Sequence, residues 1–270
     1  MGSQISDCCQ RIQNKSAHLF LSTPASAAMS LQVLPSGRSE LIQKLRSSLQ
    51  QAHHSLRLNN HQHDVISTGI PALDHLLPQQ GLPRGTLSEW IAAEPGSGML
   101  FLAMQVAGQA QRSGPLVIID ALQCFYPPAF TATGVQTDHT ILIHPKSRAD
   151  KLWAMEQCLR CRGTGAVLCQ IDSLKTKEFR RLQLAAESGK AIGLLIRSAA
   201  ARRQPGWADV RLLIAPQTSP LKFHRRVEVR CLYAKGSLND QIISLDICDE
   251  TGAVRLAAGV SHSATASRTD

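Results

Sequence analysis

Short apolar runs alternate with helix-like segments through the middle of the chain. Runs that suit buried strands occur at Leu87–Ala92, Pro115–Asp120, His139–His144, Ala166–Ile171 and Ala191–Ile196. Runs of this length and composition are typical of parallel strands that are covered on both faces. Strands that alternate with helices predict an α/β fold: a doubly wound, mostly parallel sheet with right-handed crossovers and helices on both faces.

Helical segments follow three of these runs. We expect helices over Gly98–Arg112, Asp150–Arg160 and Thr176–Ser188, and Ser147 stands in capping-box spacing at the start of the second. Gly189 is the expected stop of the third helix, because glycine favours the left-handed conformation that ends many helices.

The last third of the chain changes to an alternation of apolar and polar residues with a period of two. The segments concerned are Val210–Ile214, Arg226–Leu232 and Gln241–Ile247, and turn-forming residues follow at 235–240 and 249–252. This pattern predicts antiparallel C-terminal strands that extend one edge of the sheet.

The sequence divides into a core over 65–258 and three flanking segments. Residues 1–35 and 259–270 are expected to be disordered, with Met29 as an alternative first residue. Residues 36–64 are expected to form an N-terminal helix, from 39 to about 55, and a polar linker. The apolar residues on one face of that helix are Leu41, Ile42, Leu45 and Leu49.

The composition is that of a globular protein with a basic balance. Of 270 residues, 43% are hydrophobic and 18% charged, and the formal net charge is +9. This charge favours an acidic partner such as nucleic acid, or a solvated basic surface, and leaves both open. The eight cysteines are scattered, no signal peptide precedes them, and no apolar run approaches the roughly 20 residues of a membrane span. We therefore expect a cytoplasmic protein with reduced thiols.

The segment after the first predicted strand resembles a phosphate-binding loop that has lost its ligands and its first glycine, whose position is taken by Ala93. A working loop reads Gly-x-x-x-x-Gly-Lys-[Ser/Thr]: backbone N–H groups cradle phosphates, the lysine reaches the β- and γ-phosphates, and the hydroxyl holds Mg²⁺. If Gly98 is the second glycine, Met99 replaces the lysine and Leu100 the hydroxyl residue. We expect Gly96, Ser97 and Gly98 to keep the turn, with weak nucleotide or anion binding left open. No catalytic residue, metal ligand or cofactor is expected.

This region resembles the opening of the RecA/RadA recombinase core. The resemblance rests on Ile66-Ser-Thr-Gly69, Leu73-Asp74, Gly81-Leu-Pro-Arg-Gly85 and Glu89, and it continues into the strand that ends at Asp120. It implies a catalytic glutamate two residues after that aspartate, where this chain has Leu122. It also implies an Asp-Ser pair that assists Mg²⁺. The candidate is Asp172-Ser173, which Leu100 would leave without a hydroxyl co-ligand.

A RecA-like chain of this length with such a loop resembles the ImuA family of bacterial SOS mutagenesis accessory proteins, catalogued near SulA-type division inhibitors. Residues 182–189, 193–197, 207–212 and 226–230 fit that family. The resemblance implies a role in SOS-induced DNA damage tolerance, assisting error-prone translesion synthesis. The implied partners are an ImuB-like inactive Y-family polymerase relative, an error-prone C-family polymerase and recombinase, with no membrane.

Basic residues gather in the last third of the chain. The candidates for nucleic-acid or partner binding are Arg202, Arg203, Arg211, Lys222, Arg225, Arg226 and Arg230. Contacts with DNA phosphates need this kind of charge and no base-specific geometry. An acidic protein would suit the same charges. Few aromatic residues interleave them, so we expect no base-stacking platform and place Trp207 in the core or an interface.

Three hypotheses for the function follow. The first is a non-catalytic RecA-like accessory protein that acts through protein contacts and, in part, DNA binding. The second is a divergent ATPase that borrows a lysine or arginine from a neighbouring subunit, and the third is a SulA-like cell division inhibitor. The first is favoured because Met99, Leu100 and Leu122 all lack the chemistry of their positions.

Overall fold

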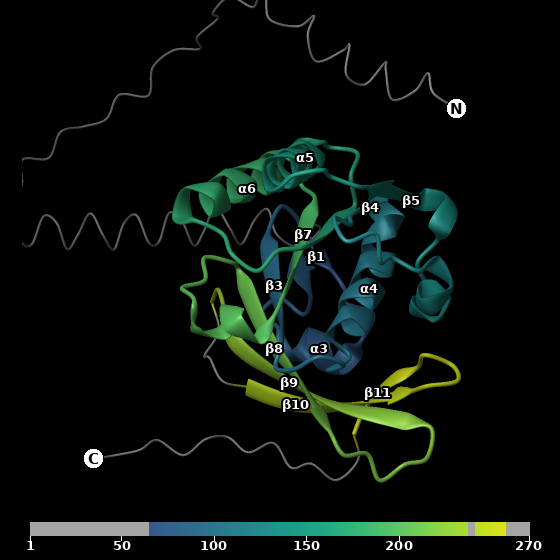
Figure 1. Cartoon of the computed structure of the whole chain (residues 1–270). Helices are drawn as coiled ribbons and strands as arrows, with labels where there is room; N and C mark the ends of the chain where they lie inside the picture. Colours follow the sequence, from purple (N-terminus) through teal and green to yellow (C-terminus); the bar gives the residue numbers. More distant parts are fainter. Residues whose placement is uncertain (1–64, 237–240, 258–270) are drawn as a thin grey trace, which may run out of the picture. The chain divides into compact units, whose positions relative to one another are not determined.

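The computed structural model of the chain describes residues 65–236 and 241–257 (Figure 1). The expected helix at 39–55 and the flanking segments 1–35 and 259–270 lie outside these residues. Within them, a nine-stranded sheet has the strand order β11-β10-β9-β8-β3-β7-β6-β4-β5. The strands from β8 to β5 are parallel to their neighbours, and β9, β10 and β11 are antiparallel.

The parallel strands confirm the predicted α/β sheet. Their bounds are β3 Leu87–Ala92, β4 Leu116–Ile119, β5 Thr140–Ile143, β6 Ala166–Gln170, β7 Ile192–Arg197 and β8 Val210–Gln217. Each end lies within one residue of the predicted run, except that β8 is three residues longer at its end. Consecutive apolar residues mark the inner strands because neighbouring side chains point to opposite faces and both faces are buried, whereas the edge strand β5 keeps Ile141 and Leu142 exposed.

The antiparallel extension is also confirmed. It consists of β9 His224–Ala234, β10 Gln241–Cys248 and β11 Val254–Leu256. The short strand β11 was not expected from the sequence. A second, two-stranded sheet pairs β1 Val65–Ile66 with β2 Leu82–Pro83, and the short helix α3 Pro71–Leu76 lies between these strands in the chain.

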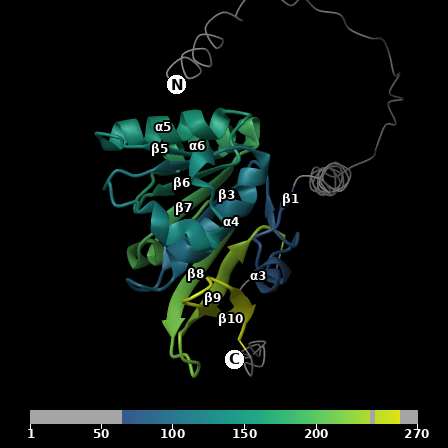
Figure 2. The ribbon, with the colours of Figure 1, turned by 90° about the vertical axis from the view of Figure 1, so that its right-hand side faces the viewer.

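Helices cover both faces of the sheet, as Figure 2 shows for α4 on one side and for α5 and α6 on the other. Their bounds are α4 Met99–Ala110, α5 Arg148–Arg160 and α6 Thr176–Gly189. Alternate strand residues divide the core in two. Ile118 and Leu168 pack with α4, whereas Val117 and Val167 pack with α5 and α6.

The caps of the helices confirm one expectation and correct another. The Ser147 hydroxyl accepts a hydrogen bond from the Asp150 backbone N–H at the start of α5. At the end of α6, however, the left-handed residue is Lys190, with φ of 62°. Gly189 serves a different need, because a Cβ at this position would lie 2.0 Å from the Leu159 carbonyl oxygen. It allows α6 to approach the end of α5.

Candidate functional site

The loop from β3 to α4 turns at two glycines. Gly96 and Gly98 have φ of 78° and 77°, a left-handed conformation that glycine adopts without strain. A Cβ on Gly98 would lie 3.1 Å from Val227 of β9, so the loop also packs closely against the extension. The Ala93 N–H donates to the Ile214 carbonyl of β8 at 2.8 Å. The loop is therefore hydrogen-bonded to β8 and packed against β9.

The first residues of α4 are apolar and differ in exposure. Met99 is 8% exposed and belongs to the core under α4, whereas Leu100 is 40% exposed. Ser97 is buried, and residues 95–100 include no charged side chain. A triphosphate placed here would lose hydration without gaining a cation or a hydroxyl in return.

The position that the resemblance assigns to a catalytic glutamate, Leu122, carries no carboxylate. Asp120 directly follows β4, and its Oδ2 accepts the Phe125 N–H at 2.8 Å, which closes the following turn. Leu122, two residues later, is 69% exposed. The aspartate therefore has a structural partner, and no acid follows it within the turn.

The expected Asp172-Ser173 pair lies at the end of β6. Asp172 Oδ1 accepts the Ser198 N–H at 2.9 Å, and this backbone hydrogen bond is the main reason why the pKa of Asp172 lies below its ordinary range. The Ser173 carbonyl accepts a hydrogen bond from Arg148 at 3.1 Å. Among the described residues, no group of three or more His, Cys, Asp or Glu side chains is arranged to hold a metal ion.

Three hollows adjoin one another at the carboxyl ends of the parallel strands. The first has a volume of about 80 Å³ and is mainly apolar, with Leu100, Met104, Phe125 and Phe130 in its wall. The second, of about 320 Å³, shares Ile119, Asp120 and Gln170 with the first and adds Lys151. The third, of about 490 Å³, shares Arg148 and Ser173 with the second and reaches Lys175 and Trp207. We call these three hollows together the carboxyl-edge groove.

A buried ionic triad lies beneath one end of the groove. Glu89 of β3 is fully buried. Its Oε1 accepts from Arg197 at 2.7 Å and its Oε2 from Arg211 at 2.6 Å. Arg197 also donates to the side chain of Gln204, and Arg211 to the backbone carbonyls of Ala201 and Gln204. The triad therefore fastens the turn after β7 to the central strand.

Gly206 continues this fastened turn towards Trp207. A Cβ on Gly206 would lie 2.4 Å from the Arg211 side chain, so the backbone at Gly206 packs directly against that side chain. Trp207, one residue on, is 57% exposed. Of the two places expected for Trp207, the core is therefore excluded and an interface stays a prediction; the residue lines the third hollow.

The candidate basic residues do not form one surface. Arg211 is held by Glu89, and Arg226 makes a two-bond pair with Asp246, with 12% of each arginine side chain exposed. The structure therefore corrects the expectation that Arg211 and Arg226 are available to bind nucleic acid or a partner. Each arginine lies opposite its carboxylate in the strand register, so its charge is neutralised inside the sheet.

The other candidates divide between faces and turns. Arg225 pairs with Asp249 and lies over the Phe101 ring, on the face of β9 opposite to Arg226. Arg230 lies 3.4 Å from Glu228. Arg202, Arg203 and Lys222 are exposed, the first two in the turn after β7 and the third before β9. Arg202 and Arg203 thus remain the candidates nearest to the groove.

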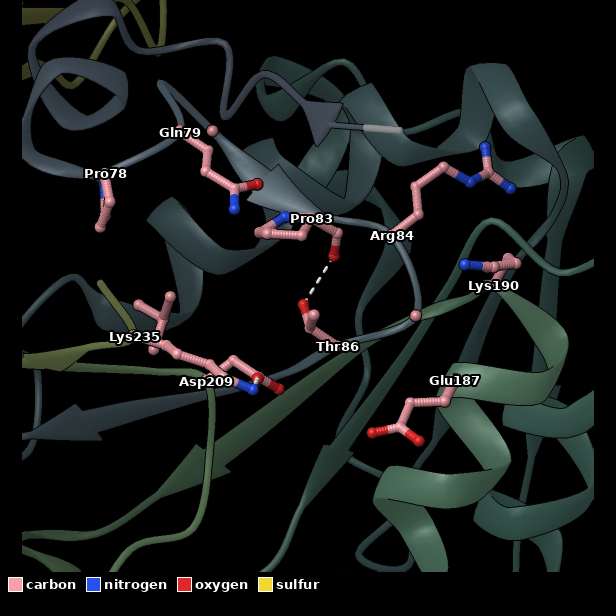
Figure 3. A pocket seen from close by; sticks show the side chains of 12 residues that line it. Pro78, Gln79, Pro83, Arg84, Thr86, Glu187, Lys190, Asp209 and Lys235 are labelled. Carbon is pink, nitrogen blue, oxygen red and sulfur yellow. Dashed lines mark hydrogen bonds and ion pairs between the residues drawn. The ribbon is translucent and has the colours of Figure 1, made fainter. Parts of the chain in front are cut away.

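A further hollow, of about 210 Å³, lies at the opposite end of the strands (Figure 3). It brings Glu187 of α6 and Lys190, directly after that helix, towards Arg84 and Thr86, with Asp209 and Lys235 on the other side. The Thr86 hydroxyl donates to the Pro83 carbonyl at 2.6 Å. Asp209 is engaged by the Leu87 N–H and by Lys235, and the charges of the wall are mixed. This hollow is separate from the loop at Gly96–Gly98.

Two basic residues of the groove, Arg148 and Lys151, were not among the candidates. Both lie on the first turn of α5. Their signal in the sequence is positional: each follows directly on a parallel strand or lies on the helix after it. Such residues meet at the carboxyl edge of a parallel sheet.

The chain has relatives among RecA and ImuA proteins. It is 33% identical to Protein RecA of Rhodopirellula baltica over 112 residues, which cover 41% of this chain and 29% of that protein. It is 27% identical to Protein ImuA of Caulobacter vibrioides over 138 residues, 49% of this chain and 57% of that protein. The chain thus spans about a third of RecA and little more than half of ImuA. No protein-family model matches it.

The fold is similar to a solved recombinase. The crystal structure of the RadB recombinase superposes with a TM-score of 0.53 at 13% sequence identity, covering 70% of this chain and 98% of that chain. This likeness concerns the fold alone. Within its described residues, the chain has no helix of the length and apolarity that crossing a membrane requires.

Proposed function

We propose that this chain, which is similar to RecA and ImuA proteins in sequence and to the RadB recombinase in fold, is a non-catalytic accessory protein of DNA damage tolerance. In this role it assists error-prone translesion synthesis through contacts with other proteins. The phosphate-binding loop is a degenerate one, retained for the fold.

The observation that carries the proposal is the environment of Met99 and Leu100. Met99 packs into the core, and Leu100 lines an apolar hollow where the ligands of a triphosphate would be needed. A hydrogen bond to a charged group is worth about 1.5–3 kcal/mol net, so loss of the lysine alone weakens nucleotide binding by one to two orders of magnitude. Leu122 stands where the catalytic glutamate would be needed, so the general base is missing as well, and a general base is typically worth about 10²-fold or more in rate.

The proposed partners follow from the family. They are an ImuB-like inactive Y-family polymerase relative, an error-prone C-family polymerase and recombinase. DNA is a further proposed partner, supported by exposed Arg202 and Arg203 and by the net charge of +9. Pairing of Arg211 and Arg226 with carboxylates reduces the basic surface on which DNA binding would depend.

Binding of a labelled, non-hydrolysable ATP analogue tests the proposal. The full chain is expected to show no saturable binding below millimolar analogue, whether it is monomeric or oligomeric. Tight binding by an oligomer would instead support a divergent ATPase that completes its site with a neighbouring subunit. Overexpression that blocks division and the polymerisation of a tubulin-like GTPase would support the SulA-like alternative.

A further inference from the structure

We propose that the carboxyl-edge groove binds an extended acidic segment of a partner protein, which inserts one large apolar side chain beside Leu100. The inference rests on the proposed function, because the same end of the sheet would hold the phosphates in a working nucleotide loop. It adds a location and a chemistry to the protein contacts proposed above.

The apolar end of the groove suits a side chain better than a phosphate. Leu100 exposes 40% of its surface on the first turn of α4, and Phe125 and Phe130 stack at 5.2 Å between ring centroids across the wall of the same hollow. Leu122 and Tyr126, in the turn after β4, are 69% and 64% exposed. Clustered exposed apolar residues of this kind mark contact sites for apolar groups of a partner.

The middle of the groove has one cation with donors to spare, in a wall of mixed charge, since Asp120 and Asp172 line the same hollow as Lys151. Lys151 donates to the Gln170 carbonyl at 3.2 Å, and an ammonium group has three N–H donors, so two stay available. The carboxylates that face the same hollow, Asp120 and Asp172, already accept backbone N–H groups. Arg148 is paired with Glu178, so Lys151 is the main cation for a ligand at this point.

The far end of the groove is basic and carries an exposed aromatic side chain on a backbone turn that is held in place. Lys175 is exposed in the third hollow, and Arg202 and Arg203 are exposed in the turn that precedes Trp207. The buried triad holds that turn through Gln204. An aromatic residue on a fastened backbone loses little entropy when it binds, which is the usual setting of an interface hot spot.

A protein segment fits the groove better than single-stranded nucleic acid. Binding sites for single strands combine a basic track with several aromatic side chains on which successive bases stack. Here the apolar hollow beside Leu100 offers nothing to a phosphate, and Trp207 lies two hollows away. An acidic peptide with one apolar anchor uses both the hollow and the cations.

Selection of a random-peptide display library on the full chain tests this proposal. We expect enriched peptides to share a large apolar residue with aspartate or glutamate beside it. Their affinity is expected to fall about tenfold or more for Lys151→Glu and for Leu100→Asp. The matched controls are Arg112→Glu, exposed beyond the other end of α4, and Leu184→Asp, exposed on α6, and neither should change the affinity.

Several results would overturn the proposal. They are failure to enrich any peptide, enrichment of peptides without acidic residues, and equal effects of groove and control variants. Displacement of the peptides by oligothymidylate, with the same dependence on Lys151 and Leu100, would assign the groove to nucleic acid instead. Circular dichroism of all four variants separates lost binding from unfolding. Because the assay contains no nucleotide, its failure leaves the non-catalytic role standing, whereas ATP turnover would end that role whatever the peptides do.

Discussion

Arg197 and Glu89 form an ion pair of 2.7 Å in which neither side chain exposes more than 2% of its surface. Arg211 holds the other carboxylate oxygen at 2.6 Å, so one buried carboxylate serves two guanidinium groups from two neighbouring strands. Removing one member of such a group is costly because a buried charge is left without compensation. The triad therefore governs both the stability of the sheet and the position of the turn before Trp207.

Glu89→Gln is expected to destabilise the protein by about 3–5 kcal/mol, because two arginines would keep their charge with no carboxylate between them. Urea unfolding followed by circular dichroism measures the change. Glu94→Gln is the control, since Glu94 is exposed in the nearby loop and should shift stability by no more than about 0.5 kcal/mol. Equal stability of the two variants would show that the triad does not hold the sheet.

Gly189→Ala is expected to destabilise the protein by about 1–3 kcal/mol, the usual cost of overpacking. The added Cβ would lie 2.0 Å from the Leu159 carbonyl oxygen, so α5 and α6 would have to separate. Gly163→Ala is the matched control, because nothing lies within 4 Å of a Cβ there. Thermal unfolding of both variants gives the comparison, and a harmless Gly189→Ala would contradict the close approach of the two helices.

Rebuilding the loop chemistry is expected to fail. Met99→Lys would place an ammonium group at a position that is 8% exposed and should cost about 1–3 kcal/mol, whereas Leu100→Thr, at 40% exposure, should be nearly neutral. The double variant should release no phosphate from ATP, because Leu122 still supplies no acid. Denaturation and a phosphate-release assay check the two halves of this prediction separately. ATP turnover by the double variant would mean that Met99 and Leu100 alone prevent the reaction and that no acid is needed at Leu122.

The contribution of Glu178 to stability is expected to disappear in acid. The hydrogen bonds from Arg148 lower the pKa of Glu178 from its ordinary 4.5 to about 2. A carboxylate with a lowered folded-state pKa stabilises above its unfolded pKa, and that stability is lost as the pH falls through the folded value. The difference in unfolding free energy between the wild type and Glu178→Gln should therefore be constant above about pH 5 and shrink towards pH 2. The difference is small because the pair is partly exposed. In an Arg148→Ala background this change with pH should be smaller, because only the Lys175 N–H and the Lys175 charge would still lower the pKa of Glu178.

The apolar runs along the sequence predicted the strands of the sheet well. Strands such as β4 and β7 could be located because burial on both faces leaves an uninterrupted apolar run. The three residues of β11 are too few to show a period, and only their pairing with β10 identifies them. Gly189 was misread because the sequence cannot distinguish a glycine that ends a helix from one that admits a neighbouring helix.

The candidate site was less predictable than the fold. Met99, Leu100 and Leu122 could be interpreted from local spacing alone. Arg211 could not, because its partner Glu89 lies 122 residues earlier and meets it only through the register of β3 and β8. The sequence could not decide between the core and an interface for Trp207 for a related reason: its exposure depends on a turn to which Arg211 donates hydrogen bonds. Charge counted along a sequence overestimates the charge that is free at a surface.

DNA-dependent ATP turnover is the most direct test of the non-catalytic account. The full chain is assayed for phosphate release with and without single-stranded DNA, beside a RecA recombinase as the positive control. The account predicts no release above background in either condition. DNA-stimulated release that is lost on Gly98→Val would contradict it, because the loop would then be a working nucleotide site.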